Sequence, residues 1–187
     1  MGTILGQMGY TSNGVIAANK MRKITKITLA LFIILVASAI PLYLYTRPAQ
    51  VQEGNLQIKG QVSNPLTITF SQLENYTPQT LEVTLSSSSR ISDNGFFNYT
   101  GVTLRTLLEQ ANVSANATSV YIQASDGYGT TIPIQDAMNQ NTIIAYQKNG
   151  LPLTALKDDG EGPLRLIIGS DQYAQRWVRG VVAIEPN

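Results

Sequence analysis

From residue 56 onward, the chain contains short segments in which hydrophobic and polar residues alternate, or in which a few apolar residues follow one another. Such segments predict β-strands with at least one buried face. They are 56–62, 66–70, 81–85, 119–124, 142–147, 163–169 and 176–185. Turn signals separate several of them, including Asn64-Pro65 and Asp126-Gly127. The pattern therefore predicts a domain built mostly from strands.

A helical period appears at fewer places. Segment 102–111 has the strongest one, with apolar residues at positions i, i+3, i+4 and i+7. Shorter helices are predicted at 71–76, where Ser71 is the expected N-cap, and at 134–140. Strands interrupted by a few short helices predict a fold of the α+β class, with a mixed β-sheet, over residues 56–187.

The segment before this domain has a different character. Residues 27–46 contain no charged side chain, and a helix of about 20 residues at about 1.5 Å each spans about 30 Å, the thickness of a bilayer's hydrocarbon core. Basic residues without any acid precede it, which predicts that residues 1–26 form a cytoplasmic tail. We therefore expect one transmembrane helix at 27–46, a linker at 47–55 and an extracytoplasmic domain at 56–187.

A cleaved signal peptide is the alternative explanation of the apolar segment. The small residues Ala37, Ser38 and Ala39 follow its most apolar part and fit a signal-peptide cleavage site. The apolar stretch continues beyond that site, which favours a retained, single-pass anchor in the cell membrane. Both explanations place the domain outside the cytoplasm.

Charge and composition narrow the range of functions. Residues 48–187 carry 12 acidic and 8 basic side chains, a formal charge of −4, so we expect no nucleic-acid partner. The sequence has no cysteine and no histidine, which excludes disulfides, zinc sites of the Cys/His type and Ser-His-Asp triads. Four N-x-Ser/Thr sequons fit an exported glycoprotein, at Asn75, Asn98, Asn112 and Asn116.

Six motifs follow one another along the predicted domain. They are IKGQVSNPLTITFSQLENY, YTGVTLRTLLEQANV, ASDGYGTTIPIQDA, IIAYQKNGLPL, GEGPLRLIIG and RWVRGVVAIE. Each is a common strand or turn by itself, but their order over about residues 55–185 resembles the molybdopterin-binding domain of the sulfite oxidase superfamily. The resemblance implies a sulfite-oxidase-like molybdopterin-binding fold for the extracytoplasmic domain.

The serine run at 86–89 stands where the resemblance implies a metal ligand. In that family, a strand such as the one at 81–85 leads into a cysteine whose sulfur binds molybdenum, and Ser87 is the best match to it. A serine hydroxyl is a harder ligand than a thiolate and is neutral at pH 7. We expect a polar strand end at this position, with Ser87 as a molybdenum ligand as the alternative.

The resemblance also assigns cofactor contacts to Thr100, Arg165 and Arg176. Arg165 lies in the motif DGEGPLR, where it would touch the pterin phosphate, but Glu161 places a negative charge beside that phosphate. An ion pair between Arg165 and a loop acid is the alternative explanation of this arginine. Trp177 is expected in the core, and we predict no catalytic residue and no metal ligand.

These departures from the family pattern predict a domain that is not an enzyme. We expect a ligand- or protein-binding module or an accessory subunit, because a fold alone carries no activity. No bound cofactor is expected, with molybdopterin as the alternative, and the expected partners are the membrane and an anionic small molecule or a membrane protein. Two other functions stay open: a molybdopterin-dependent oxidoreductase with a non-cysteine metal environment, and a structural cell-envelope protein.

Overall fold

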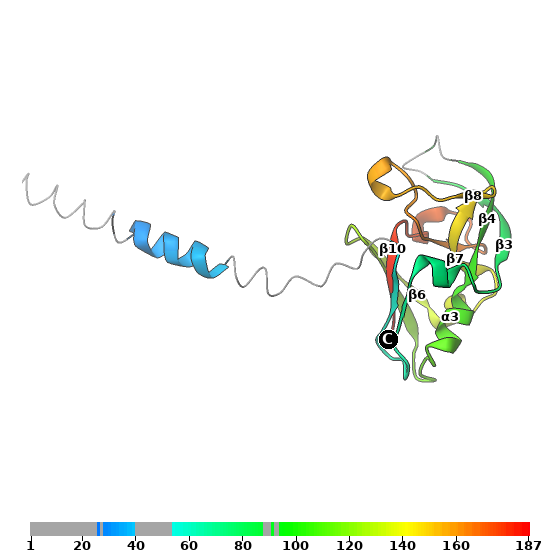
Figure 1. Cartoon of the computed structure of the whole chain (residues 1–187), viewed down its shortest axis with the longest axis horizontal. Helices are drawn as coiled ribbons and strands as arrows, with labels where there is room; N and C mark the ends of the chain where they lie inside the picture. The colour runs from blue at the N-terminus through cyan, green and yellow to red at the C-terminus, as the bar shows by residue number, and fades with distance from the viewer. Residues whose placement is uncertain (1–25, 27, 40–53, 88–90, 92–93) are drawn as a thin grey trace, which may run out of the picture. The chain divides into compact units, whose positions relative to one another are not determined.

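The structure is a computed structural model of the chain (Figure 1), and it describes residues 26, 28–39, 54–87, 91 and 94–187. The chain divides into two compact units, Met1–Ala49 and Gln50–Asn187. The described part of the first unit consists of a helix and one further residue, Lys26. The second unit contains all the strands that the structure describes.

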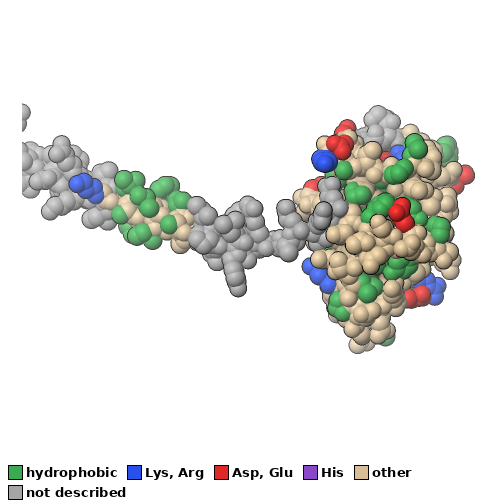
Figure 2. Space-filling model, in the orientation of Figure 1, with side chains coloured by type: hydrophobic (Ala, Val, Ile, Leu, Met, Phe, Trp, Pro, Cys, Tyr) green, Lys and Arg blue, Asp and Glu red, His purple; other side chains and the backbone are tan. Residues whose placement is uncertain are grey.

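Residues 28–39 of the first unit are helical. Their large apolar side chains are exposed, such as Phe32 at 63% and Leu35 at 64%, and Figure 2 shows hydrophobic side chains along this helix. The described part of the chain contains no helix that is both long and apolar enough to cross a membrane. Residues 27 and 40–46 lie outside the described residues, so the transmembrane helix at 27–46 stays a prediction.

Within the described residues, the strands of the second unit form two five-stranded sheets. The first sheet has the order β2-β1-β10-β5-β6, of which Figure 1 labels β10 and β6. Its strands are β1 (Leu56–Ile58), β2 (Leu66–Ile68), β5 (Ser119–Ala124), β6 (Gly129–Pro133) and β10 (Val181–Pro186). β1 runs parallel to β10, and the other neighbours are antiparallel. The sheet is therefore mixed, which confirms the predicted sheet type.

The second sheet has the order β3-β4-β7-β8, and β9 also pairs with β7. Its strands are β3 (Gln79–Leu85), β4 (Gly95–Thr103), β7 (Thr142–Lys148), β8 (Leu151–Pro152) and β9 (Arg165–Ile168). Every pair in this sheet is antiparallel. The first five residues of β7 are buried, as expected for a strand that is covered on both faces.

Short helices connect the strands. They are α2 (Phe70–Leu73), α3 (Leu104–Gln110), α4 (Ile134–Ala137) and the 3-10 turns η2 (Leu156–Asp158) and η3 (Ala174–Arg176). The apolar period predicted for α3 is confirmed by a buried face of Leu104, Leu107, Leu108 and Ala111. The cap predicted for α2 was wrong: Thr69, rather than Ser71, is the N-cap, and it forms a reciprocal capping box with Gln72.

The structure contains strands that the sequence pattern missed. β4 begins at Gly95, in a segment without clear alternation, and continues into the region predicted as helix 102–111. β6 and β8 were not predicted either. The strand predicted at 176–185 begins only at Val181, and Trp177 precedes it in a buried position, which confirms the expected burial of this side chain.

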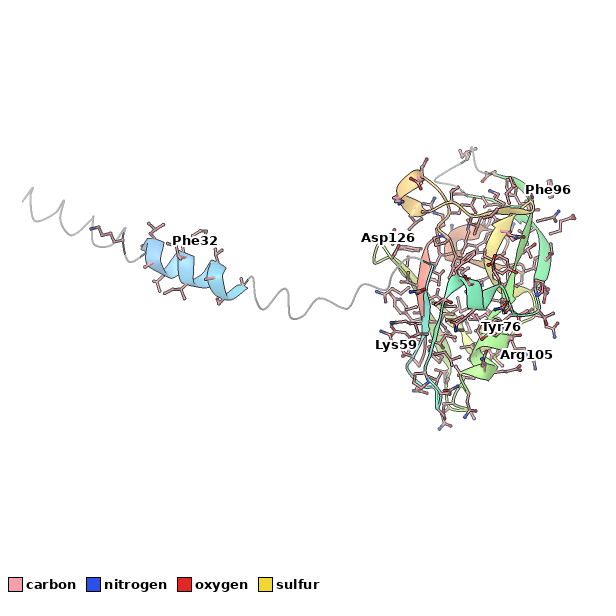
Figure 3. All side chains as sticks on the ribbon, in the orientation of Figure 1. Phe32, Lys59, Tyr76, Phe96, Arg105 and Asp126 are labelled. Atoms are coloured by element: carbon pink, nitrogen blue, oxygen red, sulfur yellow. The ribbon has the colours of Figure 1, made fainter. Side chains whose placement is uncertain are left out.

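The turn between β5 and β6 has the predicted chemistry. The Asp126 carboxylate accepts a hydrogen bond from the Tyr128 N–H at 2.9 Å, and Figure 3 labels Asp126. Gly127 supplies the positive φ, +88°, that the turn needs. Asp126 therefore supports the turn, which confirms its predicted structural role.

Gly101 lies where the backbone of β4 comes very close to the backbone of its paired strand β7. The register between the two strands shifts between Thr100 and Gly101. A Cβ atom at position 101 would overlap the carbonyl oxygen of Ile144 and lie 2.5 Å from the Cα of Ala145. Since these neighbours are backbone atoms of a buried strand, moving them aside would cost considerable free energy.

Gly101→Ala is expected to destabilise the domain by about 3 kcal/mol, because overpacking against backbone forces the two strands apart. The measurement is the urea midpoint, followed by the fluorescence of the single tryptophan. Asn98→Ala, at an exposed position on the same strand, is the control and should change stability by about 0.5 kcal/mol or less. Equal midpoints for the two variants would contradict the close approach of β4 and β7.

Candidate functional site

Arg165 is the starting point of the site because its charge is buried. The residue is 5% exposed, and no other charged residue that the structure describes is buried as deeply. β9 holds it in place, because Arg165 pairs with Ala145 of β7 and forms an isolated bridge with Arg179. A buried guanidinium is strongly destabilising unless a counter-charge and hydrogen-bond acceptors meet it.

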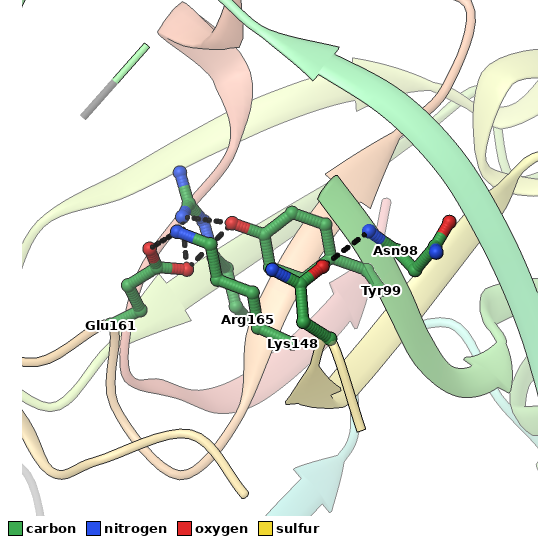
Figure 4. A network of polar contacts seen from close by, with 6 residues as sticks. Asn98, Tyr99, Lys148, Glu161 and Arg165 are labelled. Atoms are coloured by element: carbon green, nitrogen blue, oxygen red, sulfur yellow. Dashed lines mark hydrogen bonds and ion pairs between the residues drawn. The ribbon is translucent and has the colours of Figure 1, made fainter. Parts of the chain in front are cut away.

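Glu161 supplies that counter-charge (Figure 4). Its carboxylate accepts hydrogen bonds from Arg165 Nη1, from Lys148 Nζ at 2.7 Å and from the Tyr99 hydroxyl at 2.8 Å. Arg165 Nη1 also donates to the Tyr99 hydroxyl at 2.9 Å. The ion pair between Arg165 and a loop acid, which was the alternative explanation of this arginine, is therefore present, and the acid is Glu161.

The second sheet brings the donors together. Tyr99 on β4 lies directly opposite Lys148 on β7, so their side chains project from the same face of the sheet. Arg165 enters from β9, on the other side of β7. Three strands that are far apart in the sequence thus place a hydroxyl, an ammonium and a guanidinium around one carboxylate.

Aromatic rings enclose the cations of this cluster. Lys148 Nζ lies 3.8 Å from the ring centroid of Phe97, and the Arg165 guanidinium carbon lies 5.5 Å from that of Tyr99 and 5.7 Å from that of Trp177. Tyr99 and Trp177 meet edge to face, with centroids 6.4 Å apart. Such rings exclude water while their faces attract the cations, which strengthens the ion pairs inside.

Two glycines fix the loop that carries Glu161. A Cβ atom on Gly160 would overlap Thr154, and one on Gly162, where φ is +86°, would overlap Gly180. The backbone is also held, because the Gly162 N–H donates to the Thr154 carbonyl at 2.8 Å and the Gly180 N–H donates to the Glu161 carbonyl at 3.1 Å. The carboxylate is therefore delivered from a tightly packed loop.

The surroundings of Glu161 act on its pKa in opposite directions. Burial raises the pKa, whereas the positive charge of Arg165 and the hydrogen bonds from Lys148, Arg165 and Tyr99 lower it by more. The net pKa lies below the ordinary value, so Glu161 is ionised at neutral pH. With Arg165 and Lys148 also charged, the three side chains carry a formal charge of +1.

Two buried donors remain next to the ion pair. Within the described residues, neither the Arg165 Nε–H nor the Trp177 Nε1–H has a hydrogen-bond partner. Buried N–H groups are nearly always paired in native proteins, so each such donor needs an explanation. Since Arg165 stacks on Trp177, the two unpaired donors belong to neighbouring side chains.

Arg176 lies in η3 and is held by two carboxylates. It donates to Asp171, through Nε at 3.1 Å and through Nη2, and to Asp136 through Nη1 at 2.7 Å. The hydrogen bonds to Asp171 and Asp136 raise the pKa of Arg176, although burial acts against them. Of the arginines that the resemblance places near the pterin phosphate, which are Arg165, Arg176 and Arg179, the first two are therefore paired with acids of this chain.

The remaining predicted residues lie at different places. The Ser87 N–H donates to Asn94 Oδ1 at 2.6 Å, and the neighbouring Ser86 carbonyl accepts from the Ala174 N–H of η3, so the start of the serine run adjoins the segment of Arg176. Residues 88 and 89 of the run lie outside the described residues. Thr100 points away from Arg165: it follows Tyr99 on β4, and its hydroxyl lies 2.8 Å from that of Thr80.

Sequence reasoning missed most of the cluster around Arg165. Tyr99 and Lys148 lie in two of the six family motifs, but the sequence assigns neither residue a role. Their proximity depends on the register of β4 against β7, and β4 itself was not predicted. The signal that could have led to them was Glu161, because an acid beside a buried arginine implies further polar partners.

Comparison with known proteins decides the family. The model of the oxidoreductase molybdopterin binding domain matches residues 45–186, about three quarters of the chain. The chain belongs to this family. The sulfite-oxidase-like molybdopterin-binding fold implied by the sequence motifs is thereby confirmed.

Two relatives support the assignment. The uncharacterized oxidoreductase YuiH of Bacillus subtilis (strain 168) is 26% identical over 138 residues, which cover 71% of this chain and 66% of that protein. The crystal structure of the sulfane dehydrogenase SoxCD from Paracoccus pantotrophus matches with a TM-score of 0.62 and 22% identity, over 75% of this chain and 39% of that one. The second likeness shows the fold alone, and the chain spans only part of both relatives.

The cluster as arranged does not fit the phosphate of a molybdopterin. The guanidinium that would bind the phosphate already binds Glu161, and a phosphate beside that carboxylate would meet like charge. The metal end of the family's cofactor also lacks its usual thiolate, because the chain has no cysteine. Within the described residues, no group of three or more acidic side chains is placed to hold a metal ion.

Glu161→Gln is expected to destabilise the domain by about 2 kcal/mol at pH 7, because it leaves two cations without their counter-charge. The pKa of Glu161 is lowered in the folded state, so its contribution is present above about pH 4.5 and is lost as the pH falls through the folded value. Urea unfolding at pH 3–7 should therefore show that the free energy of unfolding falls less steeply with decreasing pH in the variant than in the wild type.

Glu109→Gln is the matched control, since Glu109 pairs with Arg105 on the surface of α3. An exposed pair of this kind contributes about 0.5 kcal/mol or less. Wild-type and Glu161→Gln curves that stay parallel down to pH 3 would contradict the role of the Glu161 carboxylate.

Proposed function

We propose that this protein is a membrane-anchored, non-catalytic member of the family, whose extracytoplasmic domain acts as a ligand- or protein-binding module or as an accessory subunit. The observation that carries the proposal is the ion pair between Arg165 and Glu161. In this pair, Glu161 occupies the guanidinium that a cofactor phosphate would need. The absence of cysteine from the sequence supports the same conclusion from the metal side of the site.

Membrane anchoring rests on the sequence of the first unit. The apolar segment 27–46 has the length of a membrane span, and the basic residues before it favour a cytoplasmic N-terminus. The exposed apolar side chains of the helix at 28–39 support a lipid environment, because a helix that is apolar all round is typically buried in a protein core or in a membrane. The domain after residue 55 would then be tethered to the outer surface of the cell membrane.

The rival function is a molybdopterin-dependent oxidoreductase. The family description and the name of the Bacillus subtilis relative favour it. It would need Ser87 or a neighbouring serine as metal ligand, and it would need Glu161 to leave Arg165. The first of these is chemically weaker than thiolate ligation, and the second would leave a carboxylate without its buried partners.

The topology is tested with engineered cysteines, because the chain has none of its own. Ala115→Cys lies at an exposed position of the domain, and Ser12→Cys lies in the predicted cytoplasmic tail. A membrane-impermeant maleimide should label the first variant in intact cells and the second only after permeabilisation. Labelling of Ser12→Cys alone in intact cells would reverse the proposed orientation.

The absence of catalysis is tested by cofactor content. The full chain, produced in a host that makes and exports molybdopterin proteins, should contain neither stoichiometric molybdenum by elemental mass spectrometry nor pterin by fluorescence after oxidation. A family member with the cysteine ligand, produced in the same host, is the positive control. Molybdenum and pterin in equal amounts with the wild-type chain would establish the oxidoreductase instead.

A further inference from the structure

The contacts of Glu161 are those that an anionic ligand would make. One carboxylate oxygen meets Lys148 Nζ at 2.7 Å, and the other meets the Tyr99 hydroxyl at 2.8 Å and Arg165 Nη1. A guanidinium, an ammonium and a hydroxyl around one oxyanion form a charge-assisted binding site. Here the oxyanion belongs to the chain itself.

The backbones that carry the donors do not depend on Glu161 for their positions. Tyr99 and Lys148 are set by the pairing of β4 with β7, and Arg165 is set by the pairing of β9 with β7. The side chain of Glu161, by contrast, reaches them from a loop. Removing its carboxylate would therefore leave the three strands in place, and the freed volume would lie beside the side chains of Lys148, Tyr99 and Arg165.

The cluster carries more positive charge and more donors than Glu161 satisfies. Lys148 and Arg165 leave a formal charge of +1 after pairing with the carboxylate. Arg179 lies opposite Arg165 in the bridge between β9 and the segment before β10, so a further cation is close to the site. Within the described residues, the Arg165 Nε–H and the neighbouring Trp177 Nε1–H are also buried without a hydrogen-bond partner.

We propose that Glu161 is a built-in anion, which fills a site of this domain that is otherwise suited to a small carboxylate or a phosphate. The proposal rests on the proposed function, in which Arg165 holds no cofactor phosphate. It assigns Glu161 a role as an intramolecular ligand. The wild-type domain has a closed site, and loss of the carboxylate converts it into a site for external anions.

Glu161→Ala tests the proposal by chemical rescue. The atoms that this substitution removes beyond Cβ correspond to an acetate ion, so acetate is the matched probe and inorganic phosphate is the second. The full chain is purified in mild detergent, and its thermal unfolding is followed at constant ionic strength with chloride as the reference salt. Acetate and phosphate should raise the unfolding temperature of the variant in a saturable manner, and should leave the wild type unchanged relative to chloride.

Two controls test where the anion binds. Glu161→Ala combined with Lys148→Gln removes one charged donor and should weaken acetate binding by about tenfold. Glu109→Ala removes an exposed acid that is paired with Arg105, and it should show no rescue. Equal rescue in all three variants, or equal stabilisation of the wild type, would overturn the proposal.

A variant that fails to fold does not end the test. If Glu161→Ala is unfolded even in acetate, Glu161→Ser still leaves room for an anion and adds a hydroxyl, and phosphate should stabilise this variant more than it stabilises the wild type. Failure of both variants to respond to either anion would overturn the proposal. A cofactor-free wild type with unresponsive variants would overturn this inference alone, whereas molybdenum and pterin in the wild type would overturn the proposed function.

Discussion

The buried charge of Arg165 is the constraint on which the arrangement of the site depends. A guanidinium in this position requires a counter-charge, and the chain provides it through Glu161, four residues earlier. That requirement explains the glycines on both sides of Glu161, because they let the loop pack against Thr154 and Gly180. It also explains why Tyr99 keeps its hydroxyl inside the core, where the group both accepts from Arg165 and donates to Glu161.

The second sheet supports this cluster because its donor side chains come from three different strands of the sheet. Lys148, Tyr99 and Arg165 come from three paired strands, so backbone hydrogen bonds fix the strand position from which each donor side chain extends. The aromatic rings of Phe97 and Trp177 then shield the cations from water. Ion pairs in such surroundings are strong when complete, and they are strongly destabilising when one partner is removed.

Local patterns in the sequence predicted the parts of the fold that depend on local physics. The period of α3 and the alternation of β5 were readable because each places its apolar residues on one face. β4 was missed because its glycines and adjacent aromatic residues blur the alternation. The site was harder to predict. Arg165 and the loop acid that it pairs with are only four positions apart in the sequence, so their pairing could be predicted. The contact between Arg165 and Tyr99 joins residues 66 positions apart and follows only from strand register.

The arginine at position 165 therefore carries less functional information than its motif suggests. In a cofactor-binding protein, the same residue would be explained by the phosphate that it binds. The ion pair with Glu161 also gives a structural explanation of Arg165, because removing either residue alone would leave an unpaired charge in a largely buried site. Each residue of the pair therefore needs the other for stability, whether or not any cofactor binds. Under the proposed function, the family motif persists in this chain as a requirement of stability, with a side chain of the same protein in place of the ligand.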